Sequence, residues 1–182
     1  PYTTLFRSLS VFLLHEKEQE EILVKIINEQ KLIYVGSIVL GLNDALVELT
    51  AMLSGITFAI HDTRTVIITV LITGIAAAFS MAGSEYLSSK ADEDVKNAKI
   101  SAVITGVSYI LTVIILLFPY LIFSNLYIAL LFTIINAILI IFLFNFYISV
   151  AKDLNFKERF IEMLSISLGV SFISFLIGVL IN

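Results

Sequence analysis

Residues 41–59 read GLNDALVELTAMLSGITFA, an apolar run that contains two carboxylates. The run lies within a longer apolar segment, Leu32–Ile60, which exceeds the roughly 20 residues that a helix needs to cross the hydrocarbon core of a membrane. Asp44 and Glu48 lie near its middle, where each charged side chain costs about 2.5–3.5 kcal/mol on insertion scales. The stretch therefore predicts a transmembrane helix whose two acids have a functional role.

The rest of the chain repeats this apolar pattern. Four further segments are long enough to cross a membrane, namely Val66–Leu87, Ile100–Phe123, Leu126–Val150 and Phe160–Ile181. Their apolar residues form continuous runs and do not alternate with a period of two, so a β-barrel is not indicated. The predicted fold is an all-α membrane protein, a bundle of five transmembrane helices.

Composition agrees with a chain that is surrounded largely by lipid. Hydrophobic residues make up 59% of the sequence and charged residues 14%, and the mean hydropathy is +1.02. The chain has no cysteine, which excludes disulfides, thiolate metal sites and cysteine nucleophiles. No basic run suggests a nucleic-acid partner, and no serine–histidine pairing at membrane depth suggests an enzyme.

The distribution of basic residues predicts the orientation. With five spans, one side of the membrane receives Lys17, Lys25, Lys31, Lys90, Lys96, Lys99, Lys152, Lys157 and Arg159. Arg64 falls on the other side. The positive-inside rule then places the N-terminus in the cytoplasm and the C-terminus on the opposite side of the membrane, which is the plasma membrane if the protein is prokaryotic.

Three regions are expected along the chain. Residues 1–8 read PYTTLFRS and resemble translated adapter sequence, so they are interpreted as a foreign segment. Residues 9–31 include the acidic stretch HEKEQEEILVKIINEQK, which is interpreted as a solvated cytoplasmic helix or as the remnant of a truncated N-terminal domain that could bind metal. Residues 32–182 form the five-span membrane domain.

Small and acidic residues share one face of the first span. At helical spacing this face carries Ser37, Gly41, Asp44, Glu48, Ala51 and Gly55. Small residues allow another helix to approach closely, so the face is predicted to meet a second copy of the chain in a homodimer. The last span carries a similar close-packing stripe of Ser167, Ser171, Ser174 and Gly178.

The second span adds candidate ligands on the face that contains Gly74, Ala77, Met81 and Glu85. Carboxylates combined with a thioether suit a borderline first-row divalent ion. The predicted metal ligands are Asp44, Glu48, Met81 and Glu85, and the predicted path-lining or interface residues are Ser37, Gly41, Asn43, Ala51, Gly55, Gly74 and Ala77. Packing is the alternative role for Met81, and extension of the carboxylate to the membrane surface is the alternative for Glu85.

Two motifs resemble the vacuolar iron transporter (VIT) family. They are GLNDALVELTAMLSGITFA at residues 41–59 and SMAGSEYLSS at residues 80–89. The resemblance implies a dimer with the ion path between protomers, lined by the first two spans, and it matches the family's first-span aspartate to Asp44 and its second-span methionine to Met81. It also implies export of ferrous iron, often manganese, in exchange for protons.

Some positions depart from the pattern of the family's plant members. Ser37 and Thr73 stand where those members have acids, and Glu48 is expected to supply the lost charge. The short segment at residues 88–99 replaces their cytoplasmic metal-binding domain, so the chain is similar to the short prokaryotic-type members.

The sequence thus predicts a divalent-metal transporter, for ferrous iron first and manganese second, that moves metal out of the cytoplasm by exchange with protons. Fe2+ or Mn2+ is the transported ion, and no permanently bound cofactor is expected. Membrane lipid and a second copy of the chain are the other expected partners. The alternative is a membrane-embedded anchor or assembly subunit in which the polar stripes only hold helices together.

Overall fold

The computed structural model describes residues 34–91, 95–152 and 154–181. The predictions for residues 1–8 and for the acidic segment at 9–31 lie outside the described residues. Residues Ser37–Asn182 form one compact unit, and the packing below is that of this unit.

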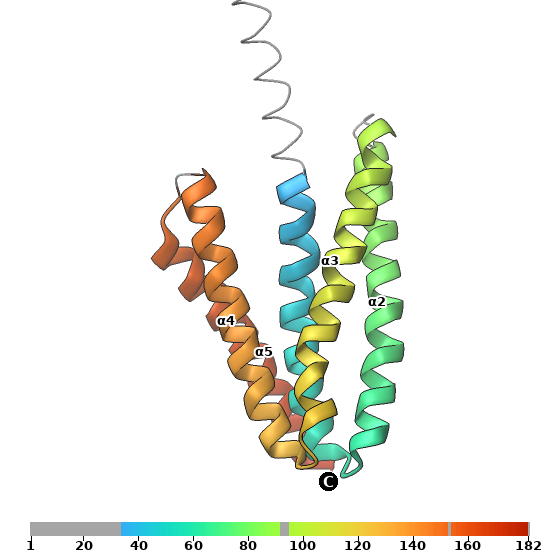
Figure 1. Ribbon diagram of the computed structural model, residues 1–182, viewed down its shortest axis with the longest axis vertical. Coiled ribbons are helices and arrows are strands. Elements are labelled where there is room, and N and C mark those ends of the chain that lie inside the picture. The colour runs from blue at the N-terminus through green and yellow to red at the C-terminus, as the bar shows by residue number, and fades with distance from the viewer. Residues whose placement is uncertain (1–33, 92–94, 153, 182) are drawn as a thin grey trace, which may run out of the picture. The chain divides into compact units, whose positions relative to one another are not determined.

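Five helices are long and apolar enough to cross a membrane. They are the first helix, Tyr34–Ala59, followed by α2 (Thr63–Ala91), α3 (Val95–Ile122), α4 (Leu126–Lys152) and α5 (Phe156–Ile181). Consecutive helices run in alternating directions (Figure 1), and the described residues contain no strand. The predicted all-α bundle of five membrane-crossing helices is therefore confirmed.

Several helices extend beyond the apolar segments that predicted them. α2 continues to Ala91 and α5 begins at Phe156, so much of the polar sequence expected to connect the spans is helical. Hydropathy marks where a helix leaves the hydrocarbon core, whereas the hydrogen-bonded backbone continues into water until a capping or turn residue ends it.

Polar side chains cap the first turns of α2 and α4. Asp62 Oδ2 accepts a hydrogen bond from the Thr65 backbone N–H at 2.8 Å, and Asn125 Oδ1 accepts one from Tyr127 at 2.9 Å, as helix N-caps do. Hydrogen bonds from the Thr65 hydroxyl and then its N–H lower the pKa of Asp62 below its ordinary value. The Asp62 cap is therefore present above the ordinary aspartate pKa and is lost as the pH falls through the lowered one.

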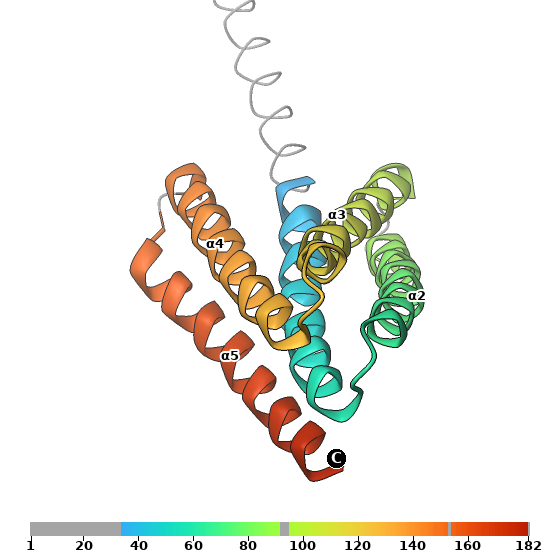
Figure 2. The same ribbon diagram turned by 60° about the horizontal axis from the view of Figure 1, so that its bottom comes forward.

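Two helix pairs flank the first helix. α2 and α3 pack along each other on one side of it, and α4 and α5 lie on the other side (Figure 2). Gly74 of α2 faces α3 so closely that an added Cβ would lie 2.9 Å from Val113 Cγ2. The buried apolar core is formed by the first helix together with α2, α3 and α4.

Hydroxyl groups and glycines join the first helix to α5. The Thr50 hydroxyl donates to Leu46 O at 2.6 Å and lies 3.1 Å from the hydroxyls of both Ser167 and Ser171. Farther along, Gly55 and Gly178 cross without side chains between them. These contacts confirm the close-packing stripe that was predicted in the last span.

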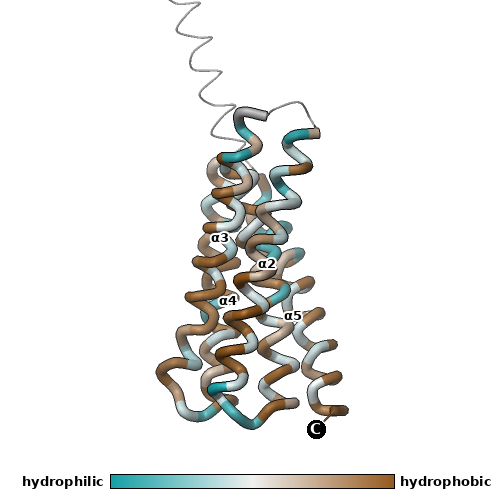
Figure 3. The backbone as a smooth tube through the Cα atoms, turned by 90° about the vertical axis from the view of Figure 1, so that its right-hand side faces the viewer, coloured by the Kyte–Doolittle hydropathy of each residue, from teal (hydrophilic) through white to brown (hydrophobic). Residues whose placement is uncertain are grey.

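The hydropathy of the backbone matches a membrane-embedded bundle. Apolar positions cover the middle of the helices, and hydrophilic ones gather toward their ends (Figure 3). α2 ends and α3 begins at one end of the unit, where α4 ends and α5 begins as well, and α5 ends at the other (Figure 1). Lys90 and Lys152 therefore lie near one end, and Arg64 near the opposite end, as the sequence predicted.

Candidate metal path

The two acids of the first helix are exposed on the surface of the single chain. Asp44 and Glu48 are one helical turn apart, and both side chains are exposed although they lie near the middle of a membrane-crossing helix. Their neighbours Ala45 and Leu49 are fully buried. The first helix therefore turns its apolar face into the core and presents its carboxylates outward.

A tyrosine of α3 holds one of these carboxylates. Tyr109 is fully buried, and its hydroxyl donates a hydrogen bond to Glu48 Oε2. A hydrogen bond to an ionised group is stronger than a neutral one and fixes its direction. Sequence reasoning missed Tyr109. The sequence does place this tyrosine in the middle of a predicted span, where its buried hydroxyl needs a hydrogen-bond partner.

Ser37 connects the first helix to α2 and α3 near the beginning of the first helix. Its hydroxyl donates to Glu85 Oε1 at 3.2 Å, and its backbone carbonyl accepts from the Thr105 hydroxyl at 3.2 Å. Glu85 is half-buried. The structure thus brings together two predicted residues, Ser37 of the first span and Glu85 of the second motif, that the sequence did not pair.

The other small residues of the predicted dimer face are used within the chain. An added Cβ at Gly41 would collide with the Thr105 backbone carbonyl, and one at Gly55 would lie 2.9 Å from Ser174 O. Ser37 and Ala51 are buried. The prediction that the whole stripe meets a partner copy is therefore corrected: Ser37, Gly41, Ala51 and Gly55 pack inside the protomer, and Asp44 and Glu48 remain exposed.

The second-span residues also face their own chain. Gly74 packs on α3, while Ala77 and Met81 are half-buried against the apolar core. Met81 and Glu85 lie one turn apart on α2, as predicted. Among the residues that the structure describes, no three His, Asp or Glu side chains gather closely enough to hold a metal ion.

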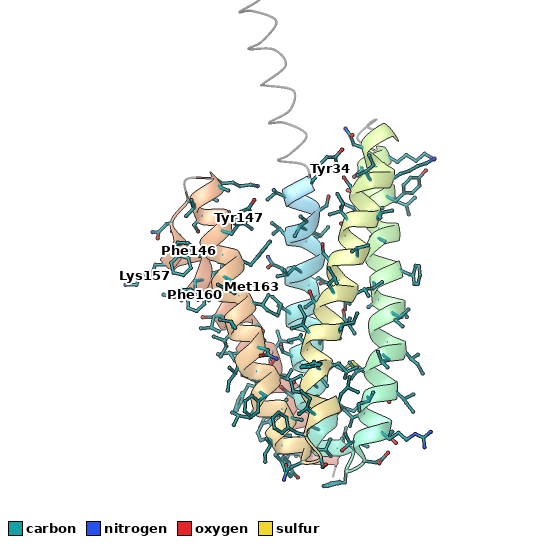
Figure 4. The ribbon with its side chains drawn as sticks, viewed as in Figure 1. Tyr34, Phe146, Tyr147, Lys157, Phe160 and Met163 are labelled. Atoms are coloured by element: carbon teal, nitrogen blue, oxygen red, sulfur yellow. The ribbon has the colours of Figure 1, made fainter. Side chains whose placement is uncertain are left out.

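An open groove adjoins Asp44 on the α5 side of the first helix. Its volume is about 290 Å³, and it is lined by Leu40, Asn43, Asp44, Val47 and Met163. Met163 lies on α5 toward the first helix (Figure 4). Sequence reasoning also missed Met163, because nothing in the sequence places residue 163 beside residue 44.

Comparison with known proteins bears on the same helices. A family model described as the VIT family matches residues 35–101, which contain the first helix, α2 and the start of α3. No curated protein matches the chain. The matched region holds both sequence motifs, both exposed carboxylates, Met81 and Glu85. The match to this family model over residues 35–101 supports the family resemblance that the motifs predicted.

Proposed function

We propose that this protein exports divalent metal from the cytoplasm, ferrous iron first and manganese second, in exchange for protons. The match to the VIT family model over residues 35–101 supports membrane metal-ion transport in general terms. The observation that carries the finer proposal is the exposed pair of carboxylates, Asp44 and Glu48, near the middle of a membrane-crossing helix.

The exposed pair also supports assembly as a homodimer. A charged side chain that faces lipid at this depth costs about 2.5–3.5 kcal/mol, so the pair requires a cover or a water-filled path. A second copy packed against this face would supply both, because two first helices would then place four carboxylates around one path. This arrangement would also provide the grouped acids that the described part of a single chain lacks.

Competition between metal and protons supports exchange. A divalent cation favours ionised carboxylates and expels their protons, and an acidic compartment on the far side would protonate them and release the metal. Glu85 lies toward the helix ends that carry most of the basic residues, which the positive-inside rule places in the cytoplasm. Its carboxylate would receive metal there before metal reaches Asp44 and Glu48.

The test is transport by proteoliposomes that contain a metal-quenched dye, with a pH gradient as the only energy source. Acid on the side of the His61 connection should accelerate Fe2+ movement toward that side, and metal movement should drive proton counterflow. Mn2+ should follow more slowly. Flux that ignores the gradient would replace exchange by passive conduction, and absence of any metal flux would favour an anchor or assembly subunit.

A further inference from the structure

The groove beside Asp44 combines three kinds of donor atom from two helices. Asp44 supplies a carboxylate and Asn43 an amide oxygen, both from the first helix, and Met163 of α5 supplies a thioether. The volume of about 290 Å³ is enough for a cation with several waters, since each water takes about 30 Å³ in the liquid.

The amide oxygen of Asn43 lacks a hydrogen-bond donor. Asn43 Oδ1 is buried and accepts no hydrogen bond among the described residues. An unsatisfied buried acceptor costs about 1–3 kcal/mol. The adjacent Asp44 carboxylate, when ionised, only accepts hydrogen bonds and cannot satisfy it. A cation beside Asp44 would satisfy both groups at once after a small side-chain movement that turns the buried Asn43 Oδ1 toward the groove.

The methionines of the chain differ in their surroundings. The sequence has three, and the sulfur of Met52 already accepts a hydrogen bond from the Thr73 hydroxyl at 3.2 Å. Met81 is packed against the apolar core. Met163 also touches this core, but in addition it lines the groove with Asp44. Its side chain therefore borders the same groove as Asp44.

We propose that Asp44, Asn43 and Met163 form a divalent-cation site within one protomer, on the α5 side of the first helix. The proposal rests on the proposed transport function, because it treats the groove as a place that the transported ion occupies. Two oxygens and a thioether favour borderline first-row ions over manganese, which prefers oxygen ligands. α5, which the family match does not reach, then takes part in choosing the ion.

The test uses the purified full chain loaded with Co2+ or Mn2+. X-ray absorption at the cobalt edge should show a sulfur neighbour in the wild-type protein and in Met81→Leu, and should lose it in Met163→Leu. Equilibrium dialysis should show Co2+ affinity at least about tenfold lower in Met163→Leu, since even partners outside the coordination shell change affinity by about 10–100-fold. Mn2+ affinity should change less than about twofold.

Met52→Leu is the matched control, because it removes a thioether that touches the same core away from the groove, and it should keep both the cobalt–sulfur signal and the affinities. Asn43→Ala should weaken Co2+ and Mn2+ binding together. If the sulfur signal survives in Met163→Leu, or disappears in Met81→Leu, the site is wrong. Should Met163→Leu not fold, a sulfur signal that survives in both Met81→Leu and Met52→Leu would assign the ligand to Met163, since the sequence has three methionines. A wild-type protein that binds Co2+ through Met163 but moves no metal in vesicles would retain the site and refute transport.

Discussion

Asp44 and Glu48 differ in their surroundings although one helical turn separates them. Glu48 accepts a hydrogen bond from the buried Tyr109, whereas Asp44 borders an open groove. A carboxylate that is hydrogen-bonded to a buried donor keeps one side-chain orientation. A carboxylate beside open space can change its orientation as an ion approaches. We therefore expect Asp44 to exchange ligands during transport and Glu48 to keep its position.

Replacing Asp44 with Asn removes the charge and retains the shape. Because the side chain is exposed and packs little, the variant should insert and assemble normally. Fe2+ flux in proteoliposomes should fall to the level of empty vesicles. Flux equal to that of the wild-type protein would show that Asp44 does not take part in the metal path.

Tyr109→Phe tests whether the orientation of Glu48 matters. Loss of the donor should lower Fe2+ or Co2+ affinity by about 10–100-fold, as loss of partners outside the coordination shell does. Tyr120→Phe is the control, since the Tyr120 hydroxyl lies 2.6 Å from the Thr57 hydroxyl and makes no bond to a carboxylate. Equal affinity losses in the two variants, measured by dialysis, would mean that Tyr109 acts only through general stability.

At the scale of helices, glycine determines how closely the first helix approaches its neighbours. In Gly41→Ala the new methyl would meet the Thr105 backbone carbonyl, which cannot move aside as a flexible side chain can. The two helices must separate, and we expect a loss of about 1–3 kcal/mol in the free energy of unfolding, typical of overpacking. The measurement is unfolding by SDS in mixed micelles.

Gly169→Ala provides the matched control. Gly169 is exposed on α5 and has no atom within 4 Å of an added Cβ, so alanine should stabilise the helix by about 0.5–1 kcal/mol. A Gly41→Ala variant as stable as Gly169→Ala would refute the close approach of the first helix to α3.

The hydroxyl contacts of Thr50 make a second test of helix packing. Thr50→Val keeps the shape and removes contacts with Ser167 and Ser171, each worth about 0.6 kcal/mol on average in membranes. Thr112→Val is the control, because the Thr112 hydroxyl bonds to Ser108 O of its own helix at 2.9 Å. SDS unfolding should show a greater loss for Thr50→Val, and the reverse order would contradict the link to α5.

For the whole molecule, the exposed acids predict where two copies meet. The chain has no cysteine, so single cysteines can be introduced without background. Leu40→Cys, one turn from Asp44, should crosslink between copies in membranes, whereas Leu139→Cys, exposed on α4, should not. Crosslinking from position 139 alone would place the interface on α4 and would leave Asp44 facing another surface.

Sequence predicted the fold better than the site. Long apolar runs are sufficient to identify membrane helices, because lipid imposes a minimum length and requires an internally bonded backbone. Helical spacing correctly placed Asp44 and Glu48 on one face. It could not separate the small residues that pack within the chain from those available to a partner, since Gly41 has the same pattern in either case. Tyr109 and Met163 depend on contacts between distant helices, which periodicity does not encode.

The crossing of Gly55 and Gly178 has a mechanical consequence. At this crossing the two backbones touch without side chains between them, and we expect α5 to make small rotations about this point. Met163 lies fifteen residues before Gly178, a lever of about 22 Å at 1.5 Å per residue, so each degree of rotation would carry its sulfur through roughly 0.4 Å of arc. The Thr50 hydroxyl contacts Ser167 and Ser171, which lie between Met163 and Gly178 on α5, and we expect these contacts to oppose the rotation. Releasing them would let a small turn at one end of α5 open or close the space beside Asp44 at the other.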